Sequence, residues 1–142
     1  MEEEAIRILS REEFANRFYG ENLFDARIDS EYENYLDEKY RLKFLVRNAN
    51  NGDVEACYKL GLMLQNGEIF TENSREASYY ANYAPNYFKY AAHYGHALAA
   101  YEMFKILKRS TPQDEELIRY FYTIYVKNRS KQQRAKDLYR ER

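Results

Sequence analysis

An internal repeat is the feature of this sequence that most constrains its fold. The segment GDVEACYKLGLML, which begins at Gly52, aligns with GHALAAYEMFKIL, which begins at Gly95. The alignment pairs Tyr58 with Tyr101 and, at most positions, matches small apolar residues with small ones and large apolar residues with large ones. Repeats of about 40 residues are typical of helical solenoids, in which each unit buries its apolar face against its neighbours.

A weaker copy of the same pattern lies earlier in the chain. Its matched pairs are Ala15 with Ala56, Tyr19 with Leu60, Gly20 with Gly61 and Leu23 with Leu64. Apolar residues recur at spacings of three and four in each copy, and an aromatic or bulky pair follows near the end of each unit, which predicts two amphipathic helices per unit. The predicted helices cover about 10–25 and 30–50, 53–66 and 74–94, and 96–109 and 114–128, with a last helix at about 130–140.

The composition agrees with helices. Two prolines and five glycines in 142 residues are too few turn residues for an all-β fold. The 45% apolar content is enough for one globular domain with a core. We therefore expect an all-α fold and a single domain over 1–142, with repeats at about 11–51, 52–94 and 95–129 and a basic capping helix or tail at 130–142.

The second unit carries the most specific pattern. Its first helix contains Ala56, Leu60, Gly61, Leu64 and Gly67, and its second helix ends with Tyr87, Phe88, Ala91, Ala92 and Gly95. This arrangement resembles the Sel1-like repeat, a relative of the tetratricopeptide repeat, and the TPQD segment at 111–114 is similar to the family's loop into its second helix. The resemblance implies a short right-handed solenoid of antiparallel helix pairs, with about three degenerate repeats.

Several positions make local predictions. Pro85 lies inside the predicted helix 74–94 and should kink or restart it. Gly61 lies inside a helix, where glycine costs roughly 0.5–1 kcal/mol relative to alanine, so we expect another helix to approach its backbone there. Gly20 predicts the same contact in the first unit. In the third unit Phe104 replaces that glycine and Arg129 replaces the glycine at the repeat boundary.

The sequence offers few candidates for catalysis. His93 and His96 are close in number, but Gly95 should end a helix between them, so we do not expect a metal pair. Cys57 lies among core residues and reads as a buried, inert thiol. No phosphate-binding glycine loop, CxxC pair or nucleophile elbow is present. We expect no catalytic activity and no cofactor or metal.

The resemblance instead implies binding of another protein, because the first helices of tetratricopeptide-like units line a concave face. The positions carried over are Phe14, Arg17, Glu21, Phe24, Asp25, Glu55, Tyr58, Leu62, Gln65, Asn66, Leu98, Tyr101, Lys105, Lys108 and Arg109. The hypothesis is a groove for an extended or helical peptide, with Tyr58, Leu62 and Tyr101 as anchors and the basic end binding acidic residues. The role would be that of an adaptor, scaffold or inhibitor.

A row of tyrosines gives a second candidate surface. Tyr79, Tyr83, Tyr87, Tyr90 and Tyr94 follow helical spacing. The row fits packing between neighbouring helices, and it also fits a surface for a partner or for self-association. Tyr80 stands outside the row and should be the most exposed.

The charge distribution leaves two further alternatives. Residues 1–40 carry 12 acidic and 5 basic side chains, and residues 105–142 carry 5 acidic and 11 basic ones. The basic third fits a nucleic-acid-associated protein, and the opposite charges of the two ends fit a self-assembling homo-oligomer. The start, MEEEAIRIL, has the pattern of neither a secretory signal nor a membrane-spanning segment, so we expect a cytoplasmic protein without a membrane partner.

Overall fold

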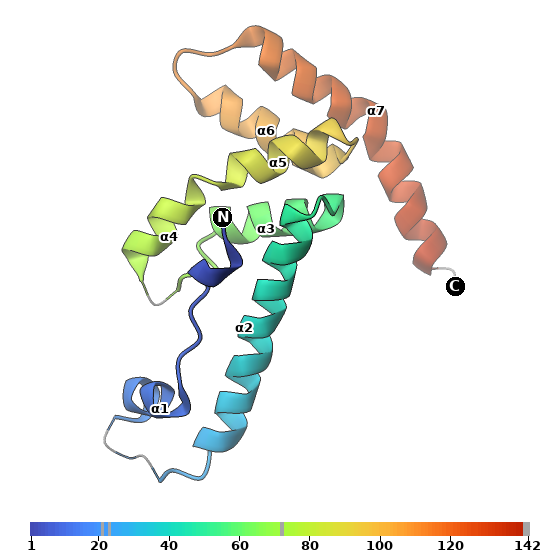
Figure 1. Cartoon of the computed structure of the whole chain (residues 1–142). Helices are drawn as coiled ribbons and strands as arrows, with labels where there is room; N and C mark the ends of the chain where they lie inside the picture. The colour runs from blue at the N-terminus through green and yellow to red at the C-terminus, as the bar shows by residue number, and fades with distance from the viewer. Residues whose placement is uncertain (21, 23, 72, 141–142) are drawn as a thin grey trace. The chain divides into compact units, whose positions relative to one another are not determined.

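The computed structural model is all-α, with no strand in the residues it describes, which are 1–20, 22, 24–71 and 73–140, with side chains described up to Arg134. The chain divides into two compact units, Met1–Arg47 and Asn48–Arg142 (Figure 1). The predicted helical class is confirmed, whereas a single repeat domain over 1–142 stays a prediction. Among the described residues, no helix is both long and apolar enough to cross a membrane.

The first unit contains η1 (Glu3–Ala5), α1 (Arg11–Tyr19) and α2 (Ile28–Asn50) as far as Arg47. A capping box begins α1, because the Glu13 backbone N–H donates to Ser10 Oγ and the Ser10 N–H donates to Glu13 Oε1, both at 3.1 Å. The helix ends at Tyr19, several residues earlier than predicted, and Gly20 terminates it with a φ of +58°.

The prediction that Gly20 lets a second helix approach is therefore wrong. No described atom lies within 4 Å of the position that a Cβ on Gly20 would occupy. The glycine serves the end of a helix instead of a helix contact. Leu23, which the repeat alignment pairs with Leu64, lies outside the described residues.

The segment before α1 is bound along α2. The Leu9 backbone N–H donates to the Tyr35 hydroxyl, and the Tyr32 hydroxyl donates to the Leu9 carbonyl, both at 2.8 Å. Farther along α2, Arg47 and Glu3 form an exposed ion pair at 2.9 Å, and this guanidinium lowers the pKa of the Glu3 carboxyl. The N-terminal segment of this unit thus runs antiparallel to α2 (Figure 1).

The second unit contains the remaining helices. They are α3 (Val54–Gln65), α4 (Ser74–Ala81), α5 (Ala84–His93), α6 (Ala97–Arg109) and α7 (Glu115–Arg140). Packing follows chain order, with α3 against α5, α5 against α6 and α6 against α7. The largest fully buried side chains of the unit include Leu60 and Leu64 of α3, Phe88 of α5 and Phe121 of α7.

The predicted break at Pro85 is confirmed. The chain leaves α4 at Ala81 and enters α5 at Ala84, with Pro85 in the first turn of the new helix. Proline lacks an N–H and clashes with the preceding turn inside a helix, but it is tolerated in the first turn, where that N–H has no acceptor within the helix.

The predicted boundary between helices at 114–128 and 130–140 is wrong. One helix, α7, runs from Glu115 to Arg140 (Figure 1). No glycine or proline occurs between these residues, and Arg129 stands where the earlier unit has a glycine, so nothing in the sequence ends the helix there.

Gly61 has the role predicted for it. A Cβ at this position would lie 2.6 Å from Cε1 of Phe88, which is fully buried. The absence of a side chain on α3 thus lets α5 place an aromatic ring directly on its backbone. The matching position in the third copy is Phe104, and its ring packs on Tyr122 of α7 at a centroid distance of 5.1 Å.

Candidate partner-binding surface

Four aromatic rings line one side of the α6–α7 pair. Tyr101 and Phe104 of α6 and Tyr122 and Tyr125 of α7 contact each other in succession, with ring centroids 4.9–6.2 Å apart. Tyr122 is 46% exposed, and the other three are half-buried. The spacings of three residues place each pair on one face of its helix.

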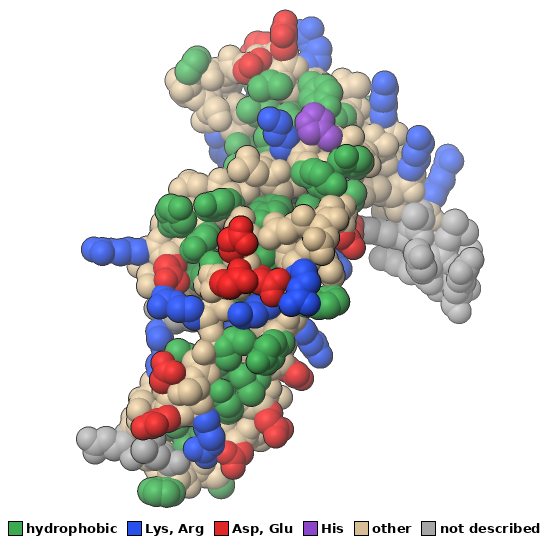
Figure 2. Space-filling view, in the orientation of Figure 1, with side chains coloured by type: hydrophobic (Ala, Val, Ile, Leu, Met, Phe, Trp, Pro, Cys, Tyr) green, Lys and Arg blue, Asp and Glu red, His purple; other side chains and the backbone are tan. Residues whose placement is uncertain are grey.

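Three cations lie over these rings. The Lys105 ammonium is 5.1 Å from the centroid of Tyr101, the Lys108 ammonium is 5.9 Å from Phe104, and the Arg129 guanidinium is 5.6 Å from Tyr125. Such geometry attracts the cation to the ring and holds it in place. We call these four rings and three cations the aromatic–cation surface. Figure 2 shows Lys and Arg side chains in blue along α7, the helix that supplies Arg129.

The cations differ in their ionic partners. Lys105 forms an ion pair with Glu102 at 2.8 Å. Over the part of the chain that the structure describes, neither Lys108 nor Arg129 has a carboxylate within 4.0 Å. Two positive charges of the surface are therefore available to an anionic group of a ligand.

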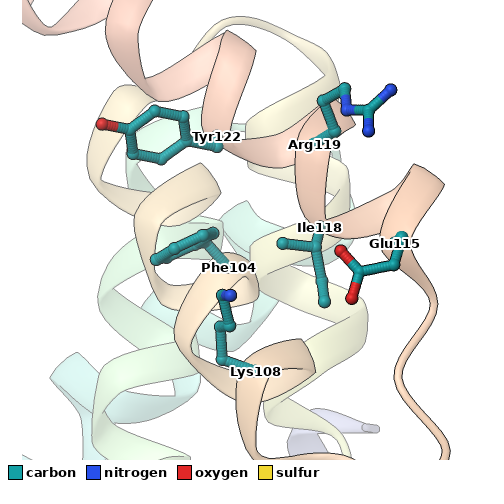
Figure 3. A pocket seen from close by; sticks show the side chains of 6 residues that line it. All are labelled: Phe104, Lys108, Glu115, Ile118, Arg119 and Tyr122. Atoms are coloured by element: carbon teal, nitrogen blue, oxygen red, sulfur yellow. The ribbon is translucent and has the colours of Figure 1, made fainter.

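An open pocket of about 330 Å³ lies at one end of the surface. Phe104 and Lys108 come from α6, and the other lining residues come from α7: Glu115, Ile118, Arg119 and Tyr122 (Figure 3). Ile118 is only 5% exposed and forms part of the apolar wall. The pocket thus combines apolar groups with two cations and one carboxylate.

The structure places the predicted groove residues of α6 differently from those of α3. Tyr101, Lys105 and Lys108 belong to the aromatic–cation surface. Leu98 is half-buried and Arg109 is exposed. Sequence reasoning did not select the partners of these residues on α7, which are Tyr122, Tyr125 and Arg129.

On α3, Tyr58 is half-buried and its ring packs on His96 at 4.3 Å and on Phe88 at 6.2 Å. Burial raises the pKa of its hydroxyl, and the carboxylates of Glu102 and Glu55 raise it further. The other α3 positions vary in exposure. Leu62 and Gln65 are half-buried, whereas Glu55 and Asn66 are exposed.

In the first unit, Phe14 is buried among Phe18, Tyr32 and Tyr35, with ring centroids 4.9–5.4 Å away. Arg17 is exposed, Phe24 is 97% exposed, and Asp25 is half-buried. Glu21 lies outside the described residues. A groove that continues through all three predicted repeats stays a prediction.

The tyrosine row divides at the break between α4 and α5. Tyr87 and Tyr90 pack inward, donating hydrogen bonds to Asn50 Oδ1 at 2.8 Å and to the Gly52 carbonyl at 3.3 Å. Tyr79 is 58% exposed at one end of the row, and Tyr94 is 67% exposed at the other. These contacts agree with the packing interpretation for the middle of the row.

The expectation that Tyr80 is the most exposed tyrosine is wrong. Its ring stacks on Phe70 at a centroid distance of 4.6 Å, so the side chain is half-buried. Tyr79, its neighbour, faces solvent instead. The short helix α4 thus turns Tyr79 outward and Tyr80 toward Phe70 in the segment after α3.

The two histidines lie on opposite sides of Gly95, as the sequence predicts. His93 Nδ1 shares a hydrogen bond with the Tyr120 hydroxyl at 2.7 Å. His96 is buried; its Nδ1 accepts from the Ala99 backbone N–H at 3.1 Å, so Nε2 carries the proton and donates to Glu55 Oε2 at 2.8 Å. His96 therefore caps α6.

Cys57 is buried, and its thiol donates to the Ala49 carbonyl at 3.3 Å. Burial, with a smaller effect of the Asp53 carboxylate, raises the pKa of the thiol to about 11. Because the thiolate is the nucleophile, a thiol that holds its proton is unreactive. No group of three or more His, Cys, Asp or Glu side chains suited to a metal occurs in the described part of the chain.

Comparison with known proteins gives no match to a family model, to a curated protein or to a solved structure. The likeness to Sel1-like repeats therefore rests on the residues quoted above and stays a prediction.

Proposed function

We propose that the chain is a non-catalytic protein-binding module, built from Sel1-like helix-pair repeats, that binds an acidic segment of another protein at the aromatic–cation surface. The observation that carries the proposal is the pairing of four contacting rings with Lys108 and Arg129, for which the described residues supply no ion-pair partner. Aromatic residues and arginine are the side chains most enriched at interface hot spots.

Two contacts support the repeat part of the proposal. The Phe88 ring lies against Gly61 in the second copy, and the Tyr122 ring lies against Phe104 in the third. Gly61 and Phe104 are aligned in the first helices of the two units. Phe88 and Tyr122 are the second members of the aromatic pairs, Tyr87–Phe88 and Phe121–Tyr122, that stand seven and eight residues before Gly95 and Arg129. In stacked repeats, equivalent positions of each repeat make equivalent contacts.

The α3 residues of the predicted groove, Tyr58 and Leu62, form a second part of the proposed binding region. Their half-burial leaves part of each side chain open to a ligand. The α6–α7 surface is favoured over them because Tyr58 already packs on His96 and Phe88.

A nucleic-acid-associated role is the second candidate, favoured by the 11 basic side chains of residues 105–142. Aromatic platforms beside cations also suit single-stranded nucleic acid. However, Glu115 lines the pocket and Glu102 neutralises Lys105, so carboxylates interrupt the positive surface. This interruption favours a peptide with separated charges over a continuous phosphate backbone.

The test compares two fluorescent probes by anisotropy: a ten-residue peptide of alternating Leu and Asp, and a single-stranded oligothymidylate of equal charge. We expect saturable peptide binding that Arg129→Glu weakens by about tenfold or more. The matched control is Lys127→Glu, which makes the same charge change at an exposed position of the same helix. It should change the affinity by less than about threefold.

Three results would refute the proposal. Tighter binding of oligothymidylate than of the peptide, with a steep salt dependence, would assign the surface to nucleic acid. Equal effects of the Arg129 and Lys127 variants would show attraction by net charge without a defined site. A light-scattering mass for the protein alone that exceeds 17.2 kDa and returns to it in Arg129→Glu would show that a second copy covers the surface.

A further inference from the structure

The pocket at the end of the aromatic–cation surface points to the kind of segment that binds there. Its walls are formed by Phe104, Ile118 and Tyr122, and Figure 3 shows these three side chains close together, with the two rings inclined to one another. A space of about 330 Å³ bounded by rings and an aliphatic side chain accepts one bulky apolar side chain. The pocket therefore supplies an apolar anchor point, which a purely acidic ligand would leave unfilled.

The available cation farthest from the pocket fixes a second contact. Tyr122 and Arg129 are separated by seven residues, two turns of α7, so they lie on one face of the helix. With a rise of 1.5 Å per residue, the distance along the helix is about 10 Å. An extended peptide advances about 3.3 Å per residue, so three residues cover this distance.

The carboxylate of Glu115 favours one orientation of the ligand. It lines the pocket together with Lys108 and Arg119, so an acidic side chain placed there would meet a carboxylate as well as two cations. No carboxylate of the described residues lies within 4.0 Å of Arg129, which lies over Tyr125 at the other end. An anionic group is therefore favoured near Arg129, and an apolar group is favoured in the pocket.

We infer that the ligand is an extended segment with a bulky apolar side chain in the pocket and an Asp or Glu three residues away, bound by Arg129. This inference rests on the proposed function and adds to it a residue pattern. The rings of Tyr101 and Tyr125 lie between the two contacts and support the intervening residues of the segment. The ligand so described is a short linear motif of another protein.

The experiment is selection of random ten-residue peptides displayed on phage against the immobilised full chain. The expected result is a consensus of Leu, Ile, Met or Phe with Asp or Glu three residues away. A synthetic consensus peptide should then lose up to about fivefold in affinity when its acid becomes Asn or when Arg129 becomes Ala, and the two changes together should cost no more than either alone.

Two controls separate the contacts. Lys127→Ala should leave the affinity for the consensus peptide within about twofold, because the side chain lies outside the surface. Tyr122→Ala should reduce the affinity for peptides that carry the bulky apolar residue. It should not change the affinity for matched peptides in which Ala replaces that residue. Circular dichroism of each variant checks that the helices remain.

The outcomes distinguish this inference from the proposed function. Selection of acidic runs with no fixed apolar position would refute the motif and leave acidic binding in place. A consensus with the predicted spacing whose affinity is independent of Arg129 would also refute the motif. Selection of peptides without acidic residues would refute both.

Discussion

The contact between Gly61 and Phe88 predicts that Gly61→Ala destabilises the protein, although alanine forms helices better than glycine. At a solvent-exposed position inside a helix, replacing glycine by alanine stabilises the folded state by about 1 kcal/mol. In α3 the new Cβ would lie 2.6 Å from Cε1 and 3.1 Å from Cζ of Phe88, a ring that is 0% exposed. Overpacking of this kind costs about 1–3 kcal/mol, so we expect a net loss on the order of 1 kcal/mol, and about 3 kcal/mol for Gly61→Leu.

The sign of the effect should reverse when the ring is removed. Phe88→Ala alone should cost about 3–5 kcal/mol, because it leaves a cavity between α3 and α5. In that background the Cβ of Gly61→Ala meets no ring, and the helix propensity of alanine should stabilise the protein by up to about 1 kcal/mol. Opposite signs in the two backgrounds give a coupling energy, which is expected for residues in contact and not for distant, independent sites.

Cys57 provides a local assay for this cycle. It is buried in α3, one turn before Gly61, so the rate at which a thiol reagent labels it under native conditions reports the opening of that helix. Gly61→Ala should accelerate labelling several-fold in the wild-type background and slow it in Phe88→Ala. Slower labelling of Gly61→Ala with Phe88 intact would show that the ring does not lie against this glycine.

Three further predictions follow from individual contacts. Because the pKa of Cys57 is raised to about 11, the folded state retains a proton that the unfolded chain loses above pH 9. The contribution of this thiol to the free energy of unfolding is therefore fully present below pH 9 and should fall by about 2 kcal/mol between pH 9 and pH 11. Urea titrations should show that Cys57→Ala removes this loss. Gln132→Ala removes the acceptor of the Ala97 and Leu98 backbone N–H groups and should cost about 1 kcal/mol and accelerate hydrogen exchange at both amides; unchanged exchange would contradict the contact. Tyr35→Phe removes the acceptor of a backbone N–H at 2.8 Å and should cost about 1 kcal/mol in thermal unfolding, and a neutral result would exclude that hydrogen bond.

Local chemistry was enough to predict where several helices begin and end. Pro85 is disfavoured in a helix interior but tolerated in a first turn, and the structure begins α5 at Ala84, directly before it. Gly95 adopts a φ of +88° between α5 and α6, which most residues avoid. Gly20 could not be assigned in the same way, because a glycine at the end of a helix and a glycine inside a helix contact look identical in sequence. Only the early end of α1 at Tyr19 distinguishes them.

The candidate surface was only half predictable. The positions carried over from the family resemblance included Tyr101, Lys105 and Lys108 on α6. The α7 side was missed, although the spacing of Tyr122, Tyr125 and Arg129 places them on one face as well. What the sequence does not contain is the antiparallel register between the two helices, which brings Tyr101 to Tyr125 and Phe104 to Tyr122.

The surface arises where the third copy departs from the repeat pattern. In the second copy, Gly61 lets the ring of Phe88 lie on the backbone of α3, and that ring is completely buried. In the third copy, Phe104 occupies the matching position and holds the corresponding ring, Tyr122, at a centroid distance of 5.1 Å, where it stays 46% exposed. Arg129, which replaces the boundary glycine, continues α7 and brings a guanidinium over Tyr125. The residues by which the third copy departs from the second thus supply the exposed rings and the charge with which we propose that the chain binds a partner.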